Sequence, residues 1–334
     1  MILVTVSVLA VLLVRLMPRR DALLAWLVAA VLAACAGLST RGGDYAEYVA
    51  IVENTRGLAD QGIALQLVVA KDPVFLAIID LAGALSDDVQ LVFVIVAALS
   101  VGTKVIATAA LPGKRTQFMA IYTVFIAPGL EFAAIRAGVA IGMMMMAYMI
   151  ARRVRWRALW VALGLASHMS TLFIVVGRLW PRWWRQMLLG LVLLGPVAIP
   201  ALASFVAEDG RYTQYLDNQG TLFAFAMPGM TLLSLLLLSR SVKGRLPSHH
   251  VVLSKDGLSA TYVVVATSLI LTPLIVTAST RVVELAWVFI LPQMLARDQL
   301  IHRRIQAYQA ASWGMFIGVL SLANILRNSW AGLS

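Results

Sequence analysis

The sequence has little charge and almost no cysteine. Only 13% of its 334 residues are charged, and Cys35 is the single cysteine. A lone cysteine excludes both a disulfide framework and a cysteine-based zinc site. Acidic residues are also scarce, 16 against 27 Lys and Arg, and no Asp-x-Asp motif for binding a metal and a nucleotide sugar is present. We therefore expect neither a metal nor another cofactor.

Apolar residues dominate instead. They make up 61% of the chain, and the mean hydropathy of +0.87 lies outside the range of soluble domains. Several apolar runs approach the roughly 20 residues that a membrane-spanning helix needs. The pattern predicts an all-α polytopic integral membrane protein with a single domain over residues 1–334. The expected spans, about ten, are 1–15, 21–39, 89–111, 116–131, 132–151, 187–206, 222–239, 259–279, 282–296 and 305–326.

The basic residues divide into two groups. Most lie in short clusters between apolar runs, and eight lie elsewhere: Arg41, Arg56, Lys71, Lys104, Arg136, Arg211, Arg281 and Arg327. Clusters between spans mark the cytoplasmic side of a membrane protein, so orientation explains the net charge of +11 without nucleic acid. Residues 40–88 and 207–220 are then periplasmic loops. The eight remaining cations need another role, and anion binding is the leading one.

Three segments depart from simple spans. Residues 1–14 lack a basic N-terminal region and are expected to form a retained first helix. Residues 73–85 are short and carry Asp80, which predicts an amphipathic helix on the outer face. Residues 158–177 lie between two basic clusters, yet they suffice for one crossing only. Either the second cluster lies outside, or this segment is re-entrant and turns back at the polar residues 167–171; both topologies stay open.

Several of the periplasmic residues have side chains suited to sugars. Asp44 and Tyr48 would share a face of a helix, and a carboxylate beside an aromatic ring is a usual way to hold a sugar. Tyrosine is also common at membrane surfaces. Arg211 and Tyr215 have the same spacing in the second loop. Lys71 precedes Asp72-Pro73, which is typical of a helix start with Asp72 as the cap.

Arg136 lies within an expected span, where a cation costs about 2.5–3.5 kcal/mol on insertion scales. It would either pair with Glu131 or Glu284 or bind a phosphate. Arg281 and Glu284, three residues apart, would form a structural pair or join an anion site. The His-x-Ser pattern of His168 and Ser170 fits either a hydrogen-bonded structural histidine or a proton-transfer group.

In their order along the chain, these residues resemble the EpsG family of exopolysaccharide polymerases, which are Wzy-like. The resemblance covers about residues 40 to 300. Ala137 departs from it where Gln is common, and Lys71 where Glu is frequent. The motifs are Asp44-Tyr45…Tyr48, Lys71-Asp72-Pro73-Val74-Phe75, Ile135-Arg136-Ala137-Gly138-Val139-Ala140, His168-Met169-Ser170, Arg211-Tyr212…Tyr215 and Arg281 through Pro292.

The resemblance implies a GT-C-like glycosyltransferase of the bacterial inner membrane. It would join oligosaccharide units carried on undecaprenyl diphosphate into a surface polysaccharide or O-antigen at the periplasmic face, with a chain-length regulator and a flippase as partners. The catalytic residues would be Asp44, Arg136, His168 and Arg281. The substrate-binding residues would be Tyr45, Tyr48, Lys71, Asp72, Glu131, Ser170, Arg211, Tyr212, Tyr215 and Glu284.

Two other functions fit the same residues. A flippase or transporter for lipid-linked sugars would also need cations in a cavity, but it would form no glycosidic bond. A ligase or other single-transfer glycosyltransferase would form one bond, so the length of its product would separate it from a polymerase.

Overall fold

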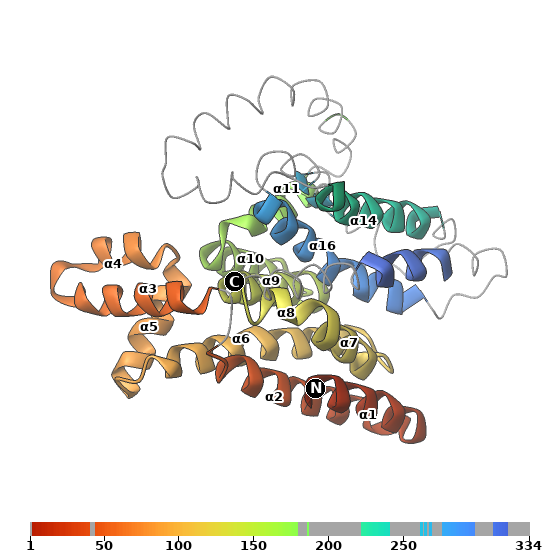
Figure 1. Cartoon of the computed structure of the whole chain (residues 1–334), viewed down its shortest axis with the longest axis horizontal. Helices are drawn as coiled ribbons and strands as arrows, with labels where there is room; N and C mark the ends of the chain where they lie inside the picture. The colour runs from red at the N-terminus through yellow and green to blue at the C-terminus, as the bar shows by residue number, and fades with distance from the viewer. Residues whose placement is uncertain are drawn as a thin grey trace. The chain divides into compact units, whose positions relative to one another are not determined.

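The computed structural model describes residues 2–40, 44–179, 186, 222–240, 261–262, 264–265, 267–268, 276–297 and 310–319. This described part of the chain is helical and contains no strand (Figure 1). The all-α prediction is therefore confirmed. The chain divides into two units, residues 1–172 and 173–334.

Helices of the first unit follow the hydropathy pattern closely. In order they are α1 (Ile2–Leu16), α2 (Asp21–Gly37), α3 (Tyr45–Gly57), α4 (Ile63–Ala70), α5 (Pro73–Leu85), α6 (Gln90–Ala107), α7 (Arg115–Ile121), α8 (Ala127–Leu130), α9 (Ile135–Met145) and α10 (Val154–Ser167). Short 3-10 turns cover Pro18–Arg20, Ala59–Gln61, Thr108–Ala110 and Met169–Thr171, and π-helical turns cover Tyr122–Ile126 and Met146–Ile150.

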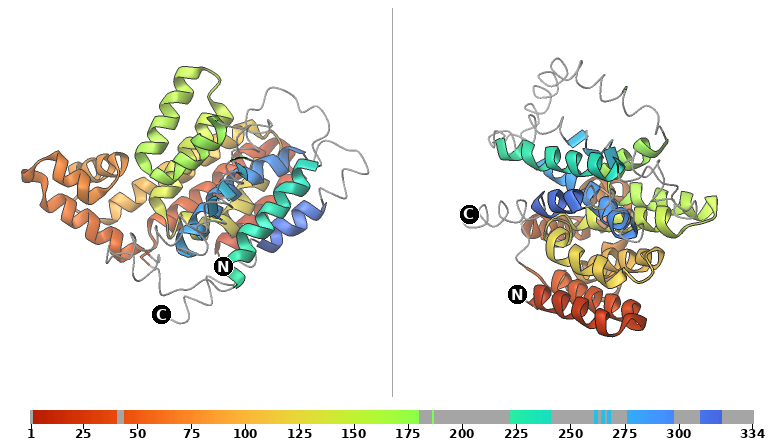
Figure 2. Two further views of the ribbon diagram at one scale, coloured as in Figure 1. Left: turned by 90° about the horizontal axis from the view of Figure 1, so that it is seen from above. Right: turned by 90° about the vertical axis from the view of Figure 1, so that its right-hand side faces the viewer.

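Close backbone approaches pack these helices. α1 and α2 lie side by side and α7 contacts both, while α6 contacts both α2 and α9 (Figure 1, Figure 2). A β-carbon at Gly37 would come within 2.9 Å of Val94 Cα, so glycine permits the approach of α2 to α6. On the other contact, α9 presents Gly138 and Gly142, four residues apart, to Ser100 and Thr103 of α6. This spacing of small residues is the usual means of bringing membrane helices together.

Two helical stretches, Pro18–Gly37 and Gln90–Ala110, are long and apolar enough to cross a membrane by length and composition. Shorter apolar helices accompany them at Ile2–Leu16, Pro73–Leu85, Ile135–Ile150, Met227–Leu238, Val282–Leu295 and Ala310–Val319. The expectation of about ten spans stays a prediction. The expected spans at 187–206 and, for most of its length, 259–279 lie outside the described residues.

The segment expected to form the first periplasmic loop is largely helical. α3 and α4 occupy most of residues 45–70, and with α5 they lie at one end of the first unit (Figure 1). Although α3 has low hydropathy, its buried residues recur with the spacing of one helix face. They are Tyr48, Ile51, Val52 and Thr55. α5 matches the predicted amphipathic helix, with Asp80 exposed and an apolar face of Phe75, Leu76, Ile78, Ile79 and Ala82 buried.

The segment 158–177 is interrupted as its polar centre suggested. α10 ends at Ser167, and a 3-10 turn follows His168 before α11 (Leu172–Leu179) begins. A turn at 167–171 belongs to the re-entrant alternative, but the choice between the two topologies stays open. The side of the membrane on which the following basic cluster lies stays a prediction.

The second unit contains most of α11, together with α14 (Leu222–Arg240) and α16 (Val276–Arg297). α14 and α16 pack together, and the buried Trp287 Nε1 donates to Thr231 Oγ1 at 3.0 Å. The expected spans 259–279 and 282–296 imply a break at Thr280 and Arg281, and this break is wrong, because α16 runs through both residues. The helix also continues past Pro292 to Arg297.

Candidate functional site

Arg136, the second residue of α9, forms an ion pair with Asp72. Its Nη1 lies 2.6 Å from Asp72 Oδ2, and the two side chains are only 12% and 10% exposed. The same nitrogen donates to the carbonyl oxygen of Ala70 at 3.2 Å. Arg136 therefore holds the junction between α4 and α5 against the start of α9. The pairing with Glu131 considered from the sequence is replaced by one with Asp72.

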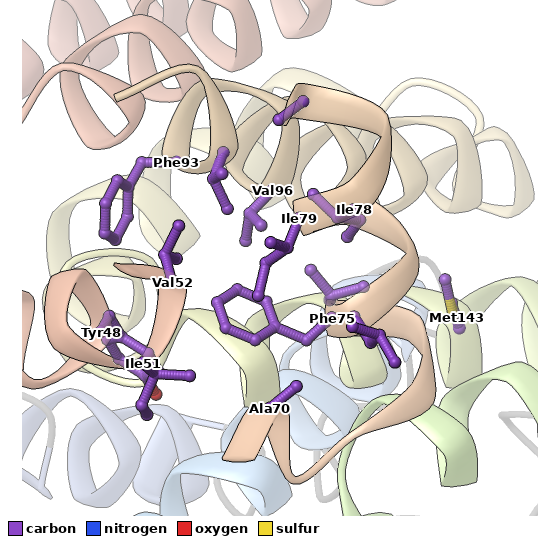
Figure 3. Close-up of a cluster of buried hydrophobic side chains, with 14 residues drawn as sticks. Tyr48, Ile51, Val52, Ala70, Phe75, Ile78, Ile79, Phe93, Val96 and Met143 are labelled. Carbon is purple, nitrogen blue, oxygen red and sulfur yellow. The ribbon is translucent and has the colours of Figure 1, made fainter. Parts of the chain in front are cut away.

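Two aromatic rings flank the Arg136 guanidinium. Its carbon lies 5.3 Å from the Tyr48 ring centroid and 5.8 Å from that of Phe75. The two rings meet edge to face at 6.0 Å, and Figure 3 shows them with Ala70 in an apolar cluster to which α3, α4, α5, α6 and α9 contribute. Cation–π attraction offsets part of the cost of burying the cation. Among the described residues, Nε of Arg136 has no hydrogen-bond partner.

The local backbone explains why Asp72 reaches Arg136. Pro73 begins α5, where its fixed φ is favourable, and Asp72 has the extended conformation of a cap residue with φ −134° and ψ 130°. The predicted helix start is confirmed, but the Asp72 side chain makes no capping hydrogen bond. Burial raises the pKa of the Asp72 carboxyl above its ordinary value, although Arg136 favours the charged form.

Lys71 lies beside this pair in an unusual conformation. Its φ of 66° puts it in the left-handed region, which a non-glycine residue rarely adopts, and this conformation reverses the chain between α4 and α5. Its ammonium is 3.5 Å from Glu47 Oε1, and both side chains are about half exposed. Such an exposed pair is weak, so Lys71 can exchange Glu47 for another anion.

Asp44 and Tyr48 lie one turn apart, as their spacing predicted. Asp44 precedes α3, and its carbonyl oxygen accepts the Tyr48 N–H at 3.0 Å. Tyr45 is directed differently. Its hydroxyl donates to Gln90 Oε1 at 2.9 Å, and its ring lies 4.8 Å from that of Phe93. Tyr48, not Tyr45, is therefore the tyrosine that joins Arg136.

Glu131 belongs to a second, fully buried ion pair. Its Oε1 is 2.9 Å from Lys104 Nζ and also accepts the Tyr122 hydroxyl. Lys104 donates further to Ser100 Oγ at 2.7 Å and to the Gly138 carbonyl oxygen at 2.6 Å. Sequence reasoning noted Lys104 as a cation away from the basic clusters but assigned it no partner. Its position inside an apolar run was the available signal.

His168 and Ser170 interact directly in the turn after α10. Ser170 Oγ is 2.7 Å from His168 Nδ1, and the Ser170 N–H donates to the same nitrogen at 3.2 Å. Because Nδ1 accepts, a neutral His168 carries its proton on Nε2. The turn packs against α9, the helix of Arg136. A catalytic role for His168 stays a prediction.

The remaining predicted residues fall in or near the second unit. Arg281 lies in α16, and Glu284, one turn later, is buried. Arg211, Tyr212 and Tyr215 lie outside the described residues. Within the residues that the structure describes, no group of three or more His, Cys, Asp or Glu side chains is arranged to hold a metal ion.

Comparisons with known proteins identify the family of this chain. No curated protein and no solved structure matches the chain. A protein-family model does match, and it covers residues 22–328, nearly the whole sequence. The apolar helices and this match identify a membrane protein. The chain belongs to the EpsG family, a family of Wzy-like polymerases.

Proposed function

We propose that this protein polymerises oligosaccharide repeat units carried on undecaprenyl diphosphate, at the periplasmic face of the inner membrane. The observation that carries the proposal is the partly buried Arg136, which is held by Asp72 and flanked by Tyr48 and Phe75. The planar fork of a partly exposed guanidinium suits the oxygens of a diphosphate.

The reaction needs one bond made and one broken. A hydroxyl at the non-reducing end of one lipid-linked unit attacks the anomeric carbon of a glycan on a second lipid. The new glycosidic C–O bond forms as the bond from that carbon to the diphosphate oxygen breaks, and a carboxylate accepts the hydroxyl proton. Negative charge develops on the departing diphosphate, where Arg136 would stabilise it.

Three carboxylates, Asp44, Asp72 and Glu131, are candidates for accepting the proton, and Glu131 is fully buried in its pair with Lys104. Asp44 remains our leading general base, because it precedes α3 on the face that carries Tyr48. Asp72 is its rival, since burial raises the pKa of its carboxyl and so makes its carboxylate more basic. Asp44→Asn and Asp72→Asn keep the side-chain shape and remove the base. The variant that loses turnover while still binding lipid-linked substrate identifies the proton acceptor.

The test of the proposal is polymerisation by the purified protein in proteoliposomes. Wild-type protein with lipid-linked repeat units should give a ladder of products on a gel, and Arg136→Ala should leave the single unit unchanged. Movement of the substrate across the bilayer without any new glycosidic bond would contradict the proposal and support a flippase. A product that stops after one transfer would contradict polymerisation and support a ligase.

A further inference from the structure

The helix α4, which leads into this site, has an unusual surface. Its eight residues, IALQLVVA, contain no charge. Four apolar side chains are between 38% and 74% exposed: Ile63, Leu65, Leu67 and Val68. At 3.6 residues per turn they spread over roughly half of the circumference of the helix. In water such a surface is unfavourable, and a helix of about 12 Å is too short to span a bilayer.

This apolar surface is physically joined to the cations of the site. Ala70 is the last residue of α4, and its carbonyl oxygen accepts a hydrogen bond from Arg136. Lys71 follows directly, with an exposed ammonium held only by Glu47. The apolar surface of α4 therefore ends next to two cations, Lys71 and Arg136, that can attract a phosphate.

We propose that α4 is the surface on which the hydrocarbon chain of the lipid-linked substrate lies, with its diphosphate directed toward Lys71 and Arg136. This inference rests on the proposed function, because it takes a polyprenyl diphosphate as the ligand of Arg136. It adds a site for the lipid part of the substrate, which gives the enzyme a reason to select a long-chain carrier.

The chemistry of the ligand fits both parts of the surface. A polyprenyl chain is apolar. When it lies along α4, it buries the exposed Leu, Ile and Val side chains of that helix, which is favourable. The diphosphate at the head of the chain carries the charge that Lys71 and Arg136 attract. Contact along α4 orients the chain so that the sugar-bearing end lies at the Arg136 site.

The experiment compares two diphosphates that differ only in chain length. Binding of undecaprenyl diphosphate and of a two-isoprene diphosphate is measured by native mass spectrometry of the purified protein. The variant Leu65→Ser/Val68→Ser removes part of the α4 surface. The matched control is Leu81→Ser/Leu85→Ser, which removes two similarly exposed leucines from the far end of α5.

We expect Leu65→Ser/Val68→Ser to weaken binding of the long-chain ligand on the order of tenfold and to leave the short-chain ligand unchanged. The control should bind both ligands as wild type does. Unchanged binding of the long chain, or an equal loss for both ligands, would overturn the role of α4. Arg136→Ala should lose binding of both ligands, and binding of both by this variant would contradict the proposed function. The comparison of the long and short chains tests the role of α4 independently of that result.

Discussion

Lys104 and Arg136 both form ion pairs in the first unit, but their surroundings differ. Lys104 is completely buried, and its ammonium is surrounded by acceptors from Ser100, Gly138 and Glu131. The side chain of Arg136 is 12% exposed, and one of its nitrogens donates to both Asp72 and Ala70. A completely buried cation presents no surface to a ligand, whereas a partly exposed one does. We therefore assign the first pair to structure and the second to function.

The two pairs are connected through α9. Lys104 of α6 holds the carbonyl oxygen of Gly138, and Arg136 is two residues earlier on the same helix. A β-carbon at Gly138 would come within 2.8 Å of Ser100 Oγ, so α6 and α9 are in close contact at this point. The Lys104–Glu131 pair thus holds in place the helix that carries Arg136.

The largest expected effect is on stability and comes from the fully buried pair. Lys104→Met leaves Glu131 charged and buried without its cation, which should cost about 3–5 kcal/mol. The double variant Lys104→Met/Glu131→Leu should be more stable than Lys104→Met alone, because no uncompensated charge remains. Thermal unfolding in detergent measures both. A double variant less stable than the single one would contradict a role for Lys104 in compensating Glu131.

The next effect concerns the geometry of the functional cation. Arg136→Lys keeps the positive charge but replaces a planar fork with a compact ammonium. We expect turnover to fall by about tenfold or more, with little change in the melting temperature. Kinetics with lipid-linked substrate at saturation supply the measurement. Full activity of Arg136→Lys would mean that charge alone suffices and would remove the argument from bidentate phosphate binding.

The contact between α6 and α9 can be disturbed without touching either charge. At Gly142 a β-carbon would overlap Thr103 Oγ1 and lie 3.0 Å from the Ser100 carbonyl oxygen. Gly142→Ala should therefore destabilise the protein by about 1–3 kcal/mol. Gly102→Ala is the control, since nothing lies within 4 Å of the added atom. Equal melting temperatures for the two variants would show that α6 and α9 can move apart at Gly142 without loss of stability, which would contradict this prediction.

The smallest effect is expected at the exposed pair of Lys71 and Glu47. Both side chains are about half exposed and 3.5 Å apart, so Glu47→Gln should change stability by less than about 1 kcal/mol. It should not weaken binding of a short-chain diphosphate, since Lys71 is released for the ligand. Weaker diphosphate binding by Glu47→Gln would mean that Glu47 positions Lys71 for the ligand. Chemical unfolding measures the change in stability of the same variant.

Elements with a clear apolar period were predictable from the sequence. The amphipathic helix 73–85 is α5, residue for residue, because Pro73 marks its start and the apolar face is continuous. The extent of α3 was not predicted, because its buried face consists of a few residues in a polar segment. The break expected between the spans 259–279 and 282–296 was wrong, because a run of Thr, Ala and Ser lowers hydropathy without breaking a helix.

The members of the candidate site were predictable, but their pairing was not. Arg136 stood out because a cation inside an apolar run needs a reason. Its partner Asp72 lies 64 residues earlier, and no spacing rule connects positions so far apart. Glu131 is near Arg136 in sequence, yet it faces Lys104 of α6, because the packing of α6 on α9 decides which charges meet.

The most direct test of the central claim measures turnover per folded molecule for two variants in one assay. One is Arg136→Ala, and the other is Lys104→Met/Glu131→Leu, which removes the buried pair as a unit. With lipid-linked substrate at saturation, the account predicts that Arg136→Ala loses on the order of 100-fold or more in rate, while the double variant stays within about tenfold of wild type. Near-wild-type turnover by Arg136→Ala, with the double variant inactive though folded, would contradict the assignment of function to Arg136 and of structure to Lys104.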